Sequence, residues 1–134
     1  MKVYKFGGAS VRNADGVRNL AHIVEGEDSL FIIVSAMGKT TNALERVFAH
    51  MQNGRKEEAN EEIKQIQAYH AEIIDDLWGE HTDINEVTLL FGQLRNIVND
   101  IVYRSTDAEL WYDTIVAFGE LISTTIISKY LNYI

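Results

Sequence analysis

The residues best suited to chemistry come early, in the segment KFGGAS at positions 5–10. Lys5 lies near the end of a short run of strand-forming residues, and Gly7 and Gly8 follow it. Glycines let a backbone approach a ligand closely, and the start of a following helix presents unpaired N–H groups and a positive dipole end. The segment therefore predicts a phosphate-binding turn whose lysine stabilises a transferred phosphoryl group. A plain glycine turn with a solvated lysine is the alternative.

Two later places carry polar residues beside apolar segments. Ser35 and Thr41 follow the apolar run at 30–34, and Glu120 follows Gly119 within an apolar helical stretch. Glycine inside a helix costs about 1 kcal/mol relative to alanine, so Gly119 predicts close approach of another backbone or a ligand. By residue type alone, Thr41 can simply cap the next helix, and Glu120 can be a solvated carboxylate.

The elements that position these residues begin with a strand, a helix and a second strand. Residues 2–6 are rich in strand formers, and Ser10 can cap a helix whose apolar face is Val17, Leu20, Ala21 and Val24. The run LFIIV at 30–34 is continuous and apolar, which is typical of a strand buried on both faces of a parallel sheet. This order predicts a βαβ unit with parallel strands.

The remainder predicts helices. One covers the apolar positions from Leu44 to Met51, and two longer ones, at 56–78 and 85–104, should pair antiparallel. A last helix follows a possible capping box of Thr106 and Glu109. Two strands alone leave exposed sheet edges, so the fold class is α/β but truncated, and we expect self-association into a homo-oligomer.

Composition limits the possible functions. The chain has 134 residues, enough for one domain, and a net charge of −8, which disfavours binding to nucleic acid. It has no cysteine, and its four histidines lack metal-ligand spacing, so no metal ligand is predicted. No segment is expected to have the length and purity of a membrane span, and no signal peptide is visible. These features predict a cytoplasmic protein that makes no contact with a membrane.

Three segments resemble motifs of aspartate kinases, within the amino acid kinase family. KFGGAS followed by Val11 is similar to the opening KFGGTSV signature, and VSAMGKTTN at 34–42 is similar to a loop of the form VSAxxxxTN. FGELIS at 118–123 is similar to the GExxS helix segment. The resemblance implies an amino acid kinase-like fold in which residues 1–134 are the N-terminal, amino-acid-binding part of an incomplete catalytic domain.

The resemblance also implies roles for individual residues. Lys5 would be catalytic at the transferred phosphoryl group, with Gly7, Gly8 and Ser10 around the phosphates of ATP. Ser35 would line the loop between the ligands, Thr41 would contact L-aspartate, and Glu120 would bind its α-ammonium. Ala9 departs from the family's usual threonine, which removes one hydroxyl from the turn.

The implied reaction transfers the γ-phosphoryl of ATP, with Mg²⁺, to the β-carboxylate of aspartate. It gives 4-phospho-L-aspartate, the first step towards lysine, threonine and methionine. In this family most nucleotide and Mg²⁺ contacts come from later residues, so we expect the chain alone to be catalytically inert. Two alternatives stay open: an amino acid kinase for glutamate, acetylglutamate or a nucleotide, and a non-catalytic module that binds partners through the helix pair at 56–104.

Overall fold

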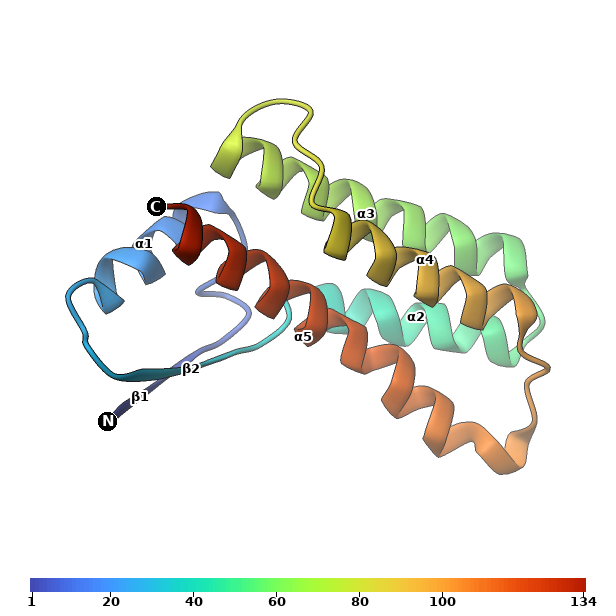
Figure 1. Cartoon of the computed structure of the whole chain (residues 1–134). Helices are drawn as coiled ribbons and strands as arrows, with labels where there is room; N and C mark the ends of the chain where they lie inside the picture. The colour runs from blue at the N-terminus through green and yellow to red at the C-terminus, as the bar shows by residue number, and fades with distance from the viewer.

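The computed structural model describes residues 1–134 as a strand–helix–strand unit joined to a bundle of four helices (Figure 1). The first unit consists of β1 (Lys2–Phe6), α1 (Ala14–Val24) and β2 (Leu30–Val34). The bundle consists of α2 (Thr40–Gln52), α3 (Lys56–Trp78), α4 (Asn85–Asp100) and α5 (Ala108–Tyr133). A short 3-10 turn, η1 (Ser105–Asp107), leads into α5.

The two strands pair in parallel, as predicted. Lys2 lies opposite Leu30 and Phe6 opposite Val34, so the register is continuous along both strands. The expected cap of α1 is wrong: Asn13, not Ser10, precedes the helix, and its Oδ1 accepts a hydrogen bond from the Gly16 N–H at 2.9 Å. Ser10 lies in the preceding turn instead, which leaves its side chain exposed.

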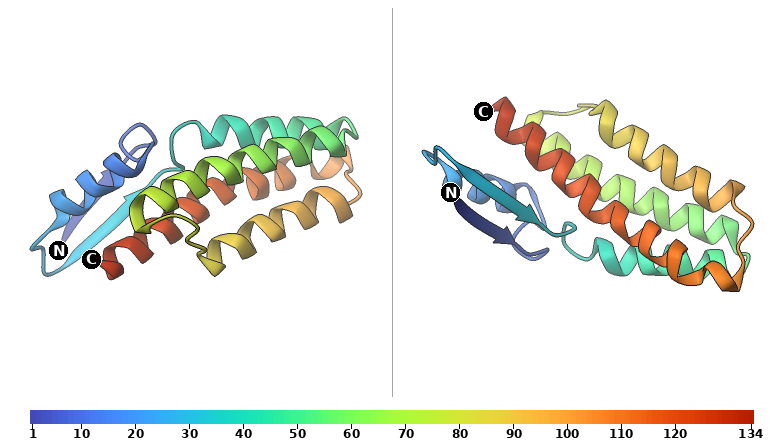
Figure 2. Two further views of the ribbon diagram at one scale, coloured as in Figure 1. Left: turned by 90° about the horizontal axis from the view of Figure 1, so that it is seen from above. Right: turned by 60° about the horizontal axis from the view of Figure 1, so that its bottom comes forward.

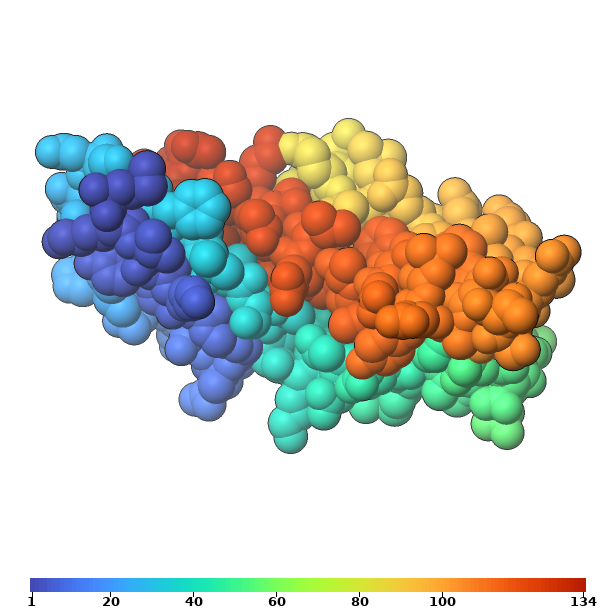
Figure 3. All heavy atoms as spheres, turned by 90° about the horizontal axis from the view of Figure 1, so that it is seen from below, coloured from blue at the N-terminus to red at the C-terminus, as the bar shows by residue number.

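The prediction that β2 is buried on both faces is also wrong. Phe31 and Ile33 are 56% and 43% exposed, and Val3, the register partner of Phe31, is 57% exposed. Side chains alternate along a strand, so these residues share one face of the sheet. Viewed from below, β1 and β2 lie open at the surface (Figure 3). The helices pack on the other face alone, and apolar composition could not reveal that.

The bundle forms because α2 to α5 each present an apolar stripe to their neighbours. Around the bundle α2 packs on α3, α3 on α4, α4 on α5, and α5 on α2. Figure 2 shows the four helices running side by side, with the sheet beyond one end. The predicted seam of α3 is buried throughout, at Ala59, Ile63, Ile66, His70, Ile73 and Leu77.

The antiparallel pairing of α3 and α4 is present, but α4 ends at Asp100 and not at residue 104 (Figure 2). Its buried seam is Val87, Phe91, Leu94 and Val98, so Leu90 and Ile97 lie beside the seam. Two contacts from α3 hold the last turn of α4. Lys56 Nζ donates to the Asn99 carbonyl at 2.9 Å, and Asn60 Nδ2 donates to Asn99 Oδ1 at 2.8 Å.

Helix α5 connects the two parts of the molecule. Its middle turns pack on α2 and α4, and its last turns lie beside β2 and α1 (Figure 1). No capping hydrogen bond forms at its start, so the predicted box of Thr106 and Glu109 is wrong. With η1 it is also long and apolar enough to cross a membrane, contrary to expectation. Its apolar residues include a full core stripe, which explains that composition: Ile115, Phe118, Ile122, Ile126, Ile127 and Tyr130.

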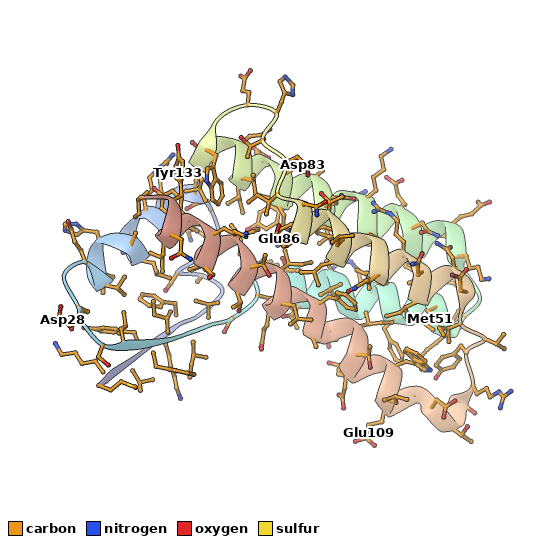
Figure 4. The ribbon with its side chains drawn as sticks, in the orientation of Figure 1. Asp28, Met51, Asp83, Glu86, Glu109 and Tyr133 are labelled. Carbon is orange, nitrogen blue, oxygen red and sulfur yellow. The ribbon has the colours of Figure 1, made fainter.

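An aromatic cluster joins α3 to α5, and one arginine links the strand unit to the bundle. Trp78, at the end of α3, packs its ring edge-on against Tyr130 of α5, with ring centroids 5.5 Å apart. Tyr133 joins this cluster near the C-terminus (Figure 4). Arg18 of α1 donates to the Asp76 carbonyl at 2.6 Å and to its Oδ1 at 3.1 Å. The two Arg18 hydrogen bonds join α1 to the end of α3.

Candidate functional site

The turn after β1 is held by its own backbone. The Ser10 N–H donates to the Gly7 carbonyl at 3.0 Å, and the Val11 N–H donates to the Gly8 carbonyl at 3.3 Å. Gly7 is exposed, and a Cβ placed there would meet no atom within 4 Å. Open space therefore surrounds the backbone at Gly7, as a turn that receives a ligand requires.

Gly8 brings this turn against the loop that follows β2. A Cβ at Gly8 would lie 2.8 Å from the Gly38 carbonyl oxygen and 2.9 Å from that of Ala36, so no side chain fits. The Gly38 N–H donates to the Gly8 carbonyl at 3.0 Å, and the Ser35 N–H donates to the Phe6 carbonyl at 2.9 Å. The first two motifs therefore form one continuous backbone surface.

Gly119 brings the third motif to the same place. A Cβ at Gly119 would lie 2.8 Å from Ala36 Cβ, 3.2 Å from Leu44 Cδ1 and 3.5 Å from Thr40 Cγ2. A close approach does occur at this glycine, but it is made by side chains and not by the backbone or ligand that the sequence predicted. Ala36 thus has the turn after β1 on one side and α5 on the other, and Glu120 follows Gly119 with its side chain exposed.

The predicted residues do not all share one setting. Lys5 is exposed and lies in register with Ile33, so its side chain projects from the uncovered face of the sheet. Ser35 is exposed in the loop after β2, and Thr41 is half-buried in the first turn of α2. No side-chain cap is made at this helix start, so the structure does not support the simple capping alternative for Thr41.

Two residues that contact these loops were missed by sequence reasoning. Thr40 is only 3% exposed, and its Oγ1 donates to the Met37 carbonyl at 2.6 Å, which fixes the loop at the start of α2. Tyr69 of α3 donates its hydroxyl to the Arg12 carbonyl. Thr40 could have been suspected from its place in the TTN segment, whereas Tyr69 lies 57 residues from Arg12 and carries no local signal.

A phosphate group fits the residues at the turn, since Gly7 is open and Lys5 is exposed beside it. A metal ion does not fit in the same way. No group of three or more histidine, aspartate or glutamate side chains is close enough to hold one. The chain therefore has open space at Gly7 and no cluster of three metal-type side chains.

Comparison with known proteins places this geometry in a family. The sequence profile of the amino acid kinase family matches residues 1–134. Aspartokinase 1, chloroplastic, from Arabidopsis thaliana is 31% identical over 98% of this chain and 23% of its own length. The aspartokinase of Chlamydia trachomatis is 28% identical over 96% of this chain and 27% of its own length. The chain thus spans about a quarter of the length of these curated relatives.

Solved structures of aspartate kinases share this fold. Aspartokinase III of E. coli in complex with lysine and aspartate aligns with a TM-score of 0.78 at 25% identity, over 97% of this chain and 28% of that one. The same enzyme with aspartate and ADP gives 0.77 at 24% identity, again over 97% and 28%. The truncated amino acid kinase fold and the resemblance to an N-terminal region of aspartate kinases are thereby confirmed. The chain belongs to the amino acid kinase family.

Proposed function

We propose that the chain forms the phosphate-binding turn and the amino-acid-binding wall of an aspartate kinase. The reaction is transfer of the γ-phosphoryl of ATP to the β-carboxylate of L-aspartate, which gives 4-phospho-L-aspartate. The observation that carries the proposal is the meeting of three segments at Ala36: its carbonyl lies against Gly8, and its methyl group lies against Gly119. Both contacts exclude a side chain at the glycine, so the three motifs are held together at close range.

On the phosphate side, the proposal assigns Gly7, Gly8 and Ser10 to the phosphates and Lys5 to the transferred group. The open backbone at Gly7 can approach an anion, and the Lys5 ammonium can follow the charge as it develops on the phosphoryl oxygens. Because the overall charge is −8, binding of phosphate depends on these local groups and not on the electrostatic field of the whole protein.

On the amino acid side, the proposal assigns Ser35, Thr41 and Glu120 to aspartate. The hydroxyls of Ser35 and Thr41 can donate to a carboxylate, and the exposed Glu120 carboxylate can accept from the α-ammonium. The packing of Gly119 on Ala36 and Thr40 holds Glu120 beside the start of α2. An acetylated amino acid lacks the ammonium, so Glu120 favours a free amino acid over acetylglutamate.

The proposal gives the chain no metal-binding step, since no cluster of suitable ligands is present. Mg²⁺, which would accompany ATP, supplies charge neutralisation of the phosphates when bound. We further propose that the polypeptide of 134 residues is not a catalyst by itself, because Lys5 projects from an uncovered, water-exposed sheet face.

A titration followed by amide NMR tests the proposal. ADP should shift the amide signals of residues 5–10, and L-aspartate should shift those around Thr41 and Glu120. Glu120→Gln should weaken aspartate binding roughly tenfold or more, because a hydrogen bond to a charged group is lost. Glu109→Gln is the matched control: Glu109 is another exposed glutamate of α5, located in the first turn of the helix (Figure 4).

Other outcomes separate the alternatives. Binding of acetylglutamate in preference to aspartate would reassign the substrate. Equal losses in Glu120→Gln and Glu109→Gln would remove Glu120 from the site. Absence of shifts at residues 5–10 with ADP, in a folded chain, would end the proposal for the turn.

A further inference from the structure

The geometry points to Tyr69 as a positioning residue that holds the phosphate-binding turn and the loop after β2 in register with each other. Its hydroxyl donates to the Arg12 carbonyl, just after the turn, and lies against Gly38 in the second loop. The inference rests on the proposed function for the meaning of the turn. The contact itself is independent of any ligand.

The space at Gly38 shows how tight this contact is. Gly38 has φ +56°, and a Cβ there would lie 2.5 Å from the Tyr69 hydroxyl oxygen and 3.4 Å from Cζ of its ring. The same Cβ would lie 3.6 Å from Arg12 Cβ. Tyr69 therefore fills the position that a side chain at residue 38 would occupy, and it does so from a different element.

The contact continues from Gly38 to the turn. The Gly38 N–H donates to the Gly8 carbonyl at 3.0 Å, and that carbonyl also accepts from the Val11 N–H at 3.3 Å. A path of direct contacts thus leads from Tyr69 through Gly38 to Gly8, and a second leads from Tyr69 through Arg12 to the end of the turn. The first path ends on Gly8, which the proposed function assigns to phosphate binding, and the second ends on Arg12, two residues after Ser10.

Tyr69 can position these loops because the part of α3 that carries it is firmly packed. It lies on α3 between two residues of the buried seam, Ile66 and His70, and its ring meets the His70 ring edge-on at 5.2 Å. Burial raises the pKa of Tyr69, so its hydroxyl stays protonated and able to donate at neutral pH. The tyrosine therefore links the helical bundle to the loops that follow the two strands.

The test uses the full chain and two matched variants. Tyr69→Phe keeps the ring and removes only the hydroxyl. Tyr112→Phe removes a comparable hydroxyl, which donates to the Glu45 carboxylate at a distance of 2.8 Å. This hydrogen bond joins α5 to α2 and does not involve the turn. Amide hydrogen exchange at Gly38 and Val11 should become about five- to tenfold faster in Tyr69→Phe, the size expected for one lost hydrogen bond. Exchange should stay unchanged in Tyr112→Phe.

A second readout links the contact to ligand binding. Tyr69→Phe should weaken binding of ADP by about five- to tenfold while the unfolding temperature stays close to that of Tyr112→Phe. Unchanged exchange at Gly38 and Val11 in Tyr69→Phe would overturn the inference, as would equal exchange in the two variants. A wild-type chain that binds no ADP would contradict the proposed function instead, and the exchange data would still decide the role of Tyr69.

Discussion

At the scale of residues, the candidate site depends on small residues that let its segments pack closely. Ala36 has one methyl group, and it lies between the backbone at Gly8 and the backbone at Gly119. Larger residues at any of these positions would separate the segments that carry Lys5, Thr41 and Glu120. The polar residues thus depend on small neighbours for their placement.

Substitution of a helical glycine tests this dependence. Gly119→Ala places a Cβ 2.8 Å from Ala36 Cβ, and the overpacking cost of about 1–3 kcal/mol exceeds the gain of about 1 kcal/mol in helix propensity. We expect a net loss of up to about 2 kcal/mol in the free energy of unfolding, measured with urea. Gly92→Ala is the control, because a Cβ there meets nothing within 4 Å, and it should gain up to about 1 kcal/mol. Equal gains in both variants would show that α5 can move away from Ala36.

At the scale of elements, local pattern predicted most of the secondary structure. Both strands and α3 match their predicted bounds, because strand formers and the alternating steps of three and four residues act over short distances. The end of α4 did not follow from the apolar pattern; Lys56 and Asn60 of α3 contact Asn99 beside it. Gly7, Gly8 and Gly119 could be singled out from the sequence, whereas Tyr69, brought close by the packing of α3, could not.

The buried His70 of α3 makes the stability of the fold depend on pH. Its side chain is fully buried, its Nδ1 lies 2.7 Å from the Ile66 carbonyl, and its Nε2 has no partner. Burial lowers the pKa of His70 in the folded state. As pH falls below about 6.5, the unfolded chain therefore binds a proton that the folded chain does not, and stability falls by up to about 1.4 kcal/mol per pH unit.

Urea unfolding between pH 7.5 and 5 measures this effect. His70→Leu should remove most of the slope over this range, because no histidine then has to stay neutral in the core. His22→Gln should keep the slope, since the His22 side chain is 82% exposed. A wild-type slope that survives in His70→Leu would assign the acid sensitivity to other groups.

At the scale of the whole molecule, the sheet is the least protected part. Each strand has an unpaired edge, and one face carries exposed Val3, Phe31 and Ile33. Exposed edges and apolar faces of this kind favour pairing with another chain. The expectation of a homo-oligomer, made from the strand count alone, thus gains a specific surface.

We predict that the chain self-associates through this face as its concentration rises. Phe31→Lys should shift light scattering towards the monomer, because it places a charge in the centre of the apolar face. Leu89→Lys is the control: Leu89 lies on α4 and is 57% exposed, against 56% for Phe31. A wild-type chain that stays monomeric at high concentration would contradict the prediction.

The position of Ala36 has a thermodynamic consequence for the proposed ligands. Ala36 lies between the turn proposed for phosphate and the segment that carries Glu120, so a shift of Ala36 would change both sides at once. If a ligand on one side moved Ala36, it would alter affinity on the other, and linkage requires the same factor in both directions. The binding affinities of nucleotide and amino acid would then be coupled and not independent.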